Sequence, residues 1–372
     1  DLQQLIDNVD RHVDARAEPP RIGQYDSHSP RVYPRVTSFD PIPLLPRYGP
    51  TGDAPVPSAA EARAYCHGLT TTHYENFSVL TSLVPGRLRD PFAAVYAFCR
   101  WSDDLGDETG STPEARARSI DLLAWWRCEL RACFAHAADP AMPAPRHPVF
   151  VALTGAIGAH GLTIEPFDDL ISAFDQDQRI TRYQTWEELL GYCRLSANPV
   201  GRIVLRLGGV TEAHPDHARI LAMSDATCTA LQLINFWQDV RRDLFDRDRV
   251  YLPEADTGVS PAMLRDWASR PTDPEARVPY IKAVRPLVVR TRALFAEGRD
   301  LPRVLPRDIA PVVRLFGDGG MATLRAVERM GCATLWDRPS LSKPTKAALV
   351  GRAMIGARIQ SMLSPKQIAH AS

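Results

Sequence analysis

Helical periodicity is the feature that most constrains what this chain can fold into. From residue 58 onward, apolar residues recur at spacings of three and four over long stretches, and turn signals separate those stretches. In one stretch Thr112 can cap a helix, Pro113 suits the first helical position, and Leu122 and Trp126 lie on one apolar stripe. Segments with strand-like alternation are nearly absent. The pattern therefore predicts an all-α, single-domain protein.

Ten segments carry this signal strongly enough to be predicted as helices. They are residues 59–73, 90–108, 112–135, 148–160, 164–176, 185–207, 214–245, 278–297, 306–329 and 343–363. Within the sixth segment, Pro199 should kink or break the helix, because proline cannot donate the required hydrogen bond.

The first 57 residues differ in composition from the rest. They contain ten of the 32 prolines and, after a short amphipathic start, no periodicity long enough to build a core. We expect residues 1–57 to form an extended or disordered arm, residues 58–363 to form the helical domain, and residues 364–372 to form a tail.

Charge and cysteine content exclude several classes of protein. Lysine plus arginine equals aspartate plus glutamate at 44 each, so no global attraction to nucleic acid is expected. The seven scattered cysteines include no CxxC pair, which argues against a disulfide framework and a zinc site. No apolar run is long enough to span a bilayer. The first residue is Asp1 rather than methionine, which leaves a removed targeting peptide open.

A first acidic helix is predicted at "YAFCRWSDDLGDE", residues 96–108. On a helical wheel Asp103, Asp107 and Asp104 lie at roughly 0°, 40° and 100°, so the three carboxylates share one face. Tyr96 and Arg100 fall on the same arc. A lone motif of this kind is more often a solvated surface, but the apolar residues beside it indicate a largely buried helix.

A second acidic helix is predicted at "ALQLINFWQDVRRDLFDRDRVYLP", residues 230–253. Relative to Asn235, the side chains of Asp239, Gln232 and Asp243 fall at roughly 40°, 60° and 80°. Buried carboxylates are costly unless cations compensate them. Two such faces would repel each other unless divalent cations lay between them. Magnesium prefers oxygen ligands and commonly bridges carboxylates to phosphates, so the pair predicts a clamp for a magnesium-bound diphosphate. Arg100 and the Arg241–Arg242 pair could bind the diphosphate oxygens directly.

The sequence resembles the squalene/phytoene synthase family over about residues 59–357. The resemblance rests on "HYENFSVLTSLVPGRLRDPFAAVYAFCRWSDDLGDE", "YCRLSANPVGRIVL" and the second acidic segment. It implies the isoprenoid synthase fold, a helical bundle around a central apolar cavity. "HYENF" and "SANPVG" are most similar to the bacterial hopanoid-pathway branch that makes hydroxysqualene from presqualene diphosphate.

The resemblance also assigns roles to individual residues. It implies metal binding by Asp103, Asp107, Asp239 and Asp243, with Asp104 beside them. It implies a diphosphate contact from Arg100, and it matches Gln232 and Asn235 to polar positions that flank the second motif. These two residues and Arg242 are expected to bind the diphosphate. It implies substrate-site or catalytic roles for His73, Tyr192 and Tyr251. At the predicted Pro199 break, Ala197 and Gly201 would leave room for a long prenyl chain, the alternative being an ordinary helix join. Asp177 and Tyr183 lie either in a surface ion-pair cluster or at the edge of the site.

The activity implied is a magnesium-dependent ionisation of presqualene diphosphate, followed by rearrangement and capture by water, with two or three magnesium ions on the diphosphate. Squalene, phytoene and presqualene diphosphate synthases are the alternatives within the family, and a non-catalytic helical scaffold is the alternative outside it. The sequence contains no GxGxxG motif after a strand, which favours water over hydride from NADPH without excluding NADPH. The expected partner is a prenyl diphosphate and not nucleic acid. Contact with a membrane surface or with the preceding pathway enzyme stays open, and the expected location is the cytoplasm.

Overall fold

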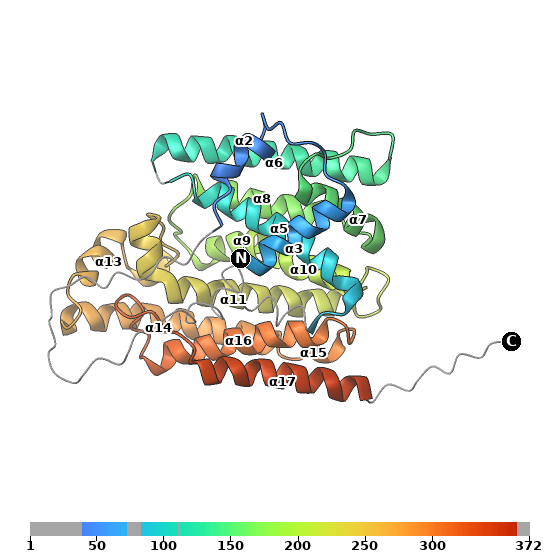
Figure 1. Cartoon of the computed structure of the whole chain (residues 1–372). Helices are drawn as coiled ribbons and strands as arrows, with labels where there is room; N and C mark the ends of the chain where they lie inside the picture. Colours follow the sequence, from blue (N-terminus) through green and yellow to red (C-terminus); the bar gives the residue numbers. More distant parts are fainter. Residues whose placement is uncertain (1–38, 73–82, 111, 363–372) are drawn as a thin grey trace, which may run out of the picture.

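The computed structural model describes residues 39–72, 83–110 and 112–362, and within these residues it contains helices and no strand (Figure 1). One isolated bridge joins Arg182 and Val250 in the same part of the chain. The all-α prediction is confirmed. The main helices are α3 (Ala59–Thr72), α5 (Gly86–Asp107), α6 (Pro113–Ala138), α7 (Pro148–His160), α8 (Glu165–Asp177), α9 (Trp186–Ser196), α10 (Asn198–Leu207), α11 (His217–Asp246), α14 (Pro274–Glu297), α16 (Ala310–Arg329) and α17 (Lys343–Met362). Shorter ones are η1 (Ile42–Leu44), α2 (Leu45–Tyr48), α12 (Glu254–Thr257), α13 (Pro261–Ala268) and α15 (Leu301–Val304).

Helix α11 runs through the middle of the molecule. In Figure 1 it separates the group formed by α3 and α5–α10 from a lower group formed by α14, α16 and α17. Within the described segments, the buried hydrophobic residues form two clusters. One is built mainly from α5–α8 with α10, and the other from α9, α11 and α14 with the end of α16. Burial of these apolar surfaces is the main stabilising contribution to the fold.

Local signals explain most helix ends. The Thr112 hydroxyl accepts from the Ala115 N–H at 3.2 Å and Pro113 occupies the first position of α6, as predicted. Helix α7 has the predicted bounds and ends at Gly161, whose φ of 59° is in the left-handed region that favours glycine. The predicted helix over residues 185–207 is broken at Ala197 into α9 and α10, which confirms the break expected from Pro199.

The expectation of an extended arm is wrong for residues 39–48, which pack against the domain and contain two short helices, whereas residues 52–57 have no secondary structure. Phe39 and Leu45 are buried, and the Phe39 ring packs edge-on against Trp101 with centroids 5.5 Å apart. Pro43 and Pro46 occupy the first turns of η1 and α2, where a proline is tolerated. Proline content alone therefore gave the wrong boundary, because it marks helix starts as well as extended chain. Residues 1–38 and the predicted tail at 364–372 lie outside the described residues.

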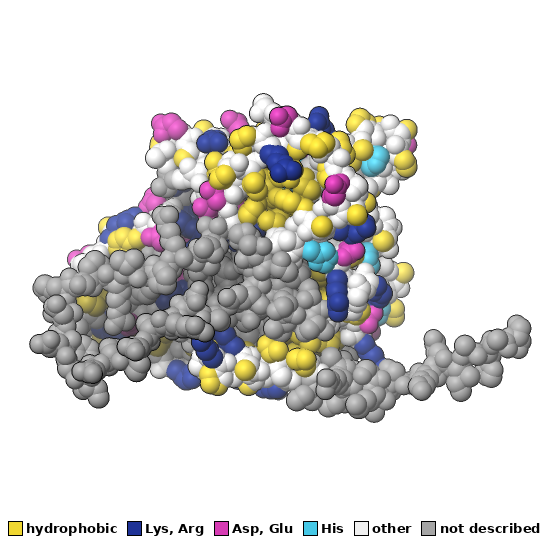
Figure 2. Space-filling view, viewed as in Figure 1, with side chains coloured by type: hydrophobic (Ala, Val, Ile, Leu, Met, Phe, Trp, Pro, Cys, Tyr) yellow, Lys and Arg dark blue, Asp and Glu magenta, His cyan; other side chains and the backbone are white. Residues whose placement is uncertain are grey.

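Helices of the described segments are too short or too polar to cross a bilayer. On the face shown in Figure 2, acidic and basic side chains are interspersed over the described surface and do not form a patch of one sign.

Candidate active site

The two acidic helices bring their carboxylates to a shared group of arginines. Arg247, just after the end of α11, lies 2.7 Å from Asp107 on α5, measured from Nη2 to Oδ2. The same guanidinium interacts electrostatically with Asp103 on α5 and with Asp243 on α11. One guanidinium can interact with carboxylates of both α5 and α11 only if these carboxylates lie close together. The aspartates therefore face a common region and do not lie on opposite sides of the molecule.

Further arginines complete this group. Arg249 Nη1 lies 3.0 Å from Asp107 Oδ1. Arg338, from the segment between α16 and α17, binds both carboxylate oxygens of Asp239, with Nη2 and Oδ2 3.3 Å apart. Arg242 Nη1 lies 3.9 Å from the same Oδ2. Divalent cations are therefore not needed to supply all the positive charge between the two acidic faces, because these four arginines already supply part of it.

Compensation by the arginines is unequal among the carboxylates. Burial opposes ionisation of Asp107, but Arg247 and Arg249 hold its pKa below the usual value. Burial and the neighbouring Asp107 raise the pKa of Asp103. Burial and the neighbouring Asp239 raise the pKa of Asp243 to about 7. Thus each acidic helix carries one carboxylate that is paired with arginines, Asp107 on α5 and Asp239 on α11. Its neighbour, Asp103 or Asp243, is compensated less well.

The donor set suits a hard divalent cation. Asp243 is 3% exposed, and its Oδ1 has no hydrogen-bond partner among the described residues. A buried carboxylate oxygen without a donor is costly and marks a place where positive charge is missing. Across residues 39–72, 83–110 and 112–362, however, no three His, Cys, Asp or Glu side chains lie close enough together to hold a metal ion. The oxygen ligands that magnesium prefers are present, and they are spread over two helices.

Arg100 and Asp104 pair with each other beside the acidic face of α5. The Arg100 guanidinium binds both oxygens of Asp104 in a buried pair, with Nη2 and Oδ1 2.6 Å apart. The same Nη2 lies 3.5 Å from the Phe39 carbonyl oxygen. Asp104 and Arg100 therefore compensate each other in the free enzyme, and their implied roles as metal ligand and diphosphate ligand stay predictions. The helical wheel placed Asp104 at the edge of the acidic face but could not show which partner it takes.

Tyr192 and Tyr251 meet at a buried carboxylate. The Tyr192 hydroxyl donates to Asp177 Oδ2 at 2.6 Å, and the Tyr251 hydroxyl lies 3.4 Å from Oδ1. Arg249 lies 3.6 Å from Asp177 and so joins this cluster to Asp107. Burial raises the pKa of Asp177 to about 6, although Arg249 opposes the change. Of the two interpretations of Asp177, the structure supports the position at the edge of the site.

The remaining predicted residues fall into three groups. Gln232 and Asn235 are each 2% exposed and lie on α11 between Thr229 and Asp239. Arg242 is half-buried beside Asp239, whereas Arg241 turns outward onto the Phe245 ring. His73 lies outside the described residues.

Sequence reasoning missed Arg247, Arg249 and Arg338. The alternating charges of "DRDR" after α11 were an available signal for the first two. Arg338 is 99 residues from Asp239 in sequence, and no local pattern connects them. Its segment is held against α11 because Gln238 donates to the Pro339 carbonyl at 2.7 Å.

The α9–α10 break packs closely along α11. A Cβ atom on Gly201 would lie 2.4 Å from Ser224 Oγ and 2.7 Å from Cys228 Sγ, so glycine allows the two helices to approach. This contact corrects the interpretation that Gly201 leaves room for a prenyl chain. The space beside Gly201 is filled by α11.

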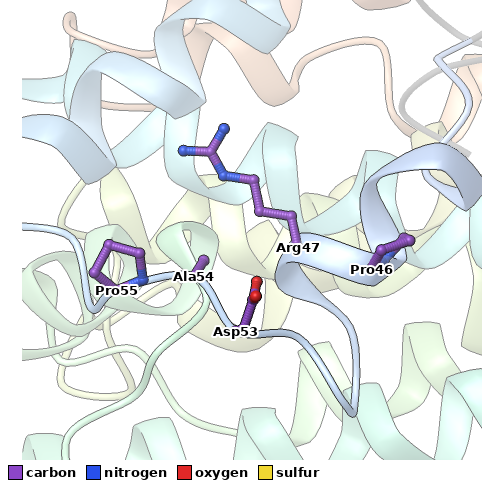
Figure 3. Close-up of a pocket in the computed structure, with 5 residues that line it drawn as sticks. All are labelled: Pro46, Arg47, Asp53, Ala54 and Pro55. Carbon is purple, nitrogen blue, oxygen red and sulfur yellow. The ribbon is translucent and has the colours of Figure 1, made fainter.

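Figure 3 shows a pocket lined by Pro46, Arg47, Asp53, Ala54 and Pro55. The Arg47 guanidinium extends away from the Asp53 carboxylate. None of the lining residues belongs to α5 or α11, and one arginine among prolines is a weak binding site for a diphosphate.

Comparison with known proteins identifies the family. The squalene/phytoene synthase family model matches residues 70–345. The hydroxysqualene synthase of Rhodopseudomonas palustris is 31% identical over 227 residues, which cover 61% of this chain and 70% of the relative. The 15-cis-phytoene synthase of Synechocystis is 32% identical over 220 residues, covering 57% and 61%. The crystal structure of squalene synthase HpnC from Alicyclobacillus acidocaldarius superimposes with a TM-score of 0.62 at 39% identity, covering 73% of this chain and 95% of the other. The chain therefore belongs to the squalene/phytoene synthase family and is a prenyl diphosphate enzyme.

Proposed function

We propose that this protein is a magnesium-dependent hydroxysqualene synthase that converts presqualene diphosphate to hydroxysqualene. The observation that carries the proposal is the convergence of Asp103, Asp107 and Asp243 on Arg247, beside a buried aromatic cluster. The similarity to hydroxysqualene synthases favours this substrate over others of the family.

The charged residues of the site have separate roles in this proposal. Asp103, Asp107, Asp239 and Asp243 would hold magnesium, which supplies the positive charge that stabilises the diphosphate as a leaving group. Arg242, Arg247, Arg249 and Arg338 balance the carboxylates in the free enzyme and lie within reach of the same region. Planar guanidinium groups bind phosphate oxygens in a bidentate manner, so these arginines suit the departing diphosphate.

The aromatic side chains would protect and orient the cation. The rings of Phe236 and Tyr251 stack with centroids 3.8 Å apart, and Tyr192 lies within 6.0 Å of both. Aromatic faces stabilise positive charge and exclude bulk water. Asp177 fixes the direction of both tyrosine hydroxyls, so we regard it as a positioning residue.

A second candidate function is the condensation of two prenyl diphosphates to squalene, phytoene or presqualene diphosphate. The similarity to 15-cis-phytoene synthases favours it. Reductive formation of squalene would additionally require NADPH.

The deciding experiment is incubation of the enzyme with magnesium and, separately, farnesyl, geranylgeranyl or presqualene diphosphate, followed by identification of the lipid products. Hydroxysqualene from presqualene diphosphate without NADPH supports the proposal. Phytoene from geranylgeranyl diphosphate, or presqualene diphosphate from farnesyl diphosphate, would instead establish the second candidate.

A matched pair of variants tests the role of the carboxylates. Asp243→Asn should lose turnover, whereas Asp246→Asn, at an exposed position three residues further along α11, should retain it. Equal turnover of the two variants at saturating magnesium would contradict the metal-binding role.

A further inference from the structure

Helices α9 and α10 run antiparallel to α11, and three contacts establish the pairing. Tyr192 lies against Phe236 with ring centroids 6.0 Å apart. The Thr229 hydroxyl donates to Asn198 Oδ1 at 2.9 Å. Gly201 lies against Ser224. Along these contacts the residue numbers rise in α9 and α10 while they fall in α11. Ser196 therefore lies between the first two contacts, opposite the turn of α11 that contains Gln232.

The contact between α9–α10 and α11 is polar around Ser196 and Gln232, although it is buried in an apolar core. Ser196 and Gln232 are each 2% exposed, Asn198 is 4% and Thr229 is 7%. The same helices contribute buried leucines and isoleucine to the surrounding cluster, namely Leu189, Leu231, Leu233 and Ile234. Thr229 and Asn198 are hydrogen-bonded to each other, which explains how these two polar side chains can be buried. This hydrogen bond does not account for Ser196, whose Oγ has no hydrogen-bond partner in the part of the chain that the structure describes.

A buried hydroxyl without a partner destabilises a fold by about 1–3 kcal/mol, so it is uncommon without a reason. Serine at the end of a helix usually bonds to a carbonyl of the preceding turn, and Ser196 does not. An ordered water satisfies such a group when several polar side chains surround it. Ser196, Asn198 and Gln232 together offer both donors and acceptors.

We propose that these residues hold one water molecule that captures the carbocation, and that Ser196 is its main positioning residue. This inference rests on the proposed function and deepens it. The position of this water relative to the charged site fits the reaction. Ser196 is one helical turn beyond Tyr192, and Gln232 is seven residues from Asp239, which corresponds to about 10 Å along α11. The water would therefore lie beyond the diphosphate, where the hydrocarbon part of the substrate extends.

The chemical step balances without a further reactant. The carbon–oxygen bond to the diphosphate breaks and its electron pair leaves with the diphosphate. The cyclopropylcarbinyl cation rearranges, and an oxygen lone pair of the held water forms the new carbon–oxygen bond. The released proton passes to the diphosphate. Without a positioned water, the same cation loses a proton from a neighbouring carbon and gives a hydrocarbon.

The test uses full-length enzyme, magnesium and presqualene diphosphate, with the variants Ser196→Ala, Thr229→Val and both together. Diphosphate release should stay within about threefold of wild type, because the variants leave the charged site intact. The ratio of hydroxysqualene to hydrocarbon should fall by about tenfold in Ser196→Ala and further in the double variant. Heavy-oxygen water should label the alcohol made by the wild type. Thr323→Val is the matched control, since Thr323 is 3% exposed and its hydroxyl donates within its own helix, to the Gly319 carbonyl.

Thermal unfolding separates this role from a structural one. Because Ser196 Oγ makes no hydrogen bond to the described protein, Ser196→Ala should melt no lower than the wild type. An unchanged product ratio in Ser196→Ala and Thr229→Val, or a lower melting temperature of Ser196→Ala without a change in products, would overturn the inference. If the wild type does not release diphosphate from presqualene diphosphate at all, the proposed function itself fails.

Discussion

His147 should make the stability of this protein depend on pH in a way that one substitution can remove. The side chain is 2% exposed and lies edge-on to Trp101 and Trp126, with ring centroids 4.6 and 4.9 Å away. Its Nδ1 accepts from the Val149 N–H at 3.2 Å and so caps α7. A proton on Nδ1 would remove this hydrogen bond and place a charge among aromatic rings. Burial accordingly lowers the pKa of His147 from 6.5 to about 3.

The magnitude follows from these two pKa values. Between pH 6.5 and about 3 the unfolded chain binds one proton more than the folded chain at this residue. The free energy of unfolding therefore falls as the pH falls through this window, approaching about 1.4 kcal/mol per pH unit, and does not change with His147 well above pH 6.5. Between pH 7 and pH 5 the loss amounts to about 2 kcal/mol.

Urea unfolding of wild type and His147→Asn at pH 7, 6 and 5 measures this loss. Asparagine keeps a capping side chain but does not titrate. The variant should be less stable at pH 7, because the ring packing is lost, and the difference between the two proteins should shrink by about 2 kcal/mol at pH 5. Buried carboxyls with raised pKa values, such as Asp177, act in the opposite direction but are common to both proteins. His217→Asn, at a half-buried position on α11, is the control. Parallel pH profiles of wild type and His147→Asn would refute the reasoning.

Three further predictions concern the site and its support. Asp239→Asn should lower turnover by at least about 100-fold, with the loss measured at saturating magnesium, because one carboxylate of the clamp is removed; full activity would contradict the clamp. Asp177→Asn should lower kcat about tenfold or more and leave KM nearly unchanged, because the Tyr192 hydroxyl loses its charged acceptor; a change in KM alone would assign Asp177 to substrate binding. Gly201→Ala should destabilise the protein by about 1–3 kcal/mol in urea unfolding, since the added Cβ would lie 2.4 Å from Ser224 Oγ, and an unchanged midpoint would show that α10 moves freely from α11.

Sequence periodicity predicted the helices well because each depends on local spacing and caps. Helix α7 was located to the residue, and the break before Pro199 followed from proline chemistry. The acidic faces of α5 and α11 were also foreseeable, since a helical wheel needs only the positions of a few aspartates.

Pairing between distant residues was not foreseeable in the same way. The wheel placed Asp104 near Asp103, yet only tertiary packing assigns Asp104 to Arg100 and leaves Asp103 under-compensated. Arg338 reaches Asp239 across 99 residues, and nothing in either local segment indicates that contact. Long-range electrostatic partners therefore have to come from the structure, even where the helices that carry them can be predicted.

The contact of Phe39 with α5 has a practical consequence for anyone who shortens this chain. A version that begins at residue 58 would keep every acidic residue of the motifs and still lose the ring that covers Trp101 and the carbonyl oxygen near Arg100. Such a truncation would expose one side of the helix that presents Asp103 and Asp107. Expression trials should therefore start upstream of Phe39.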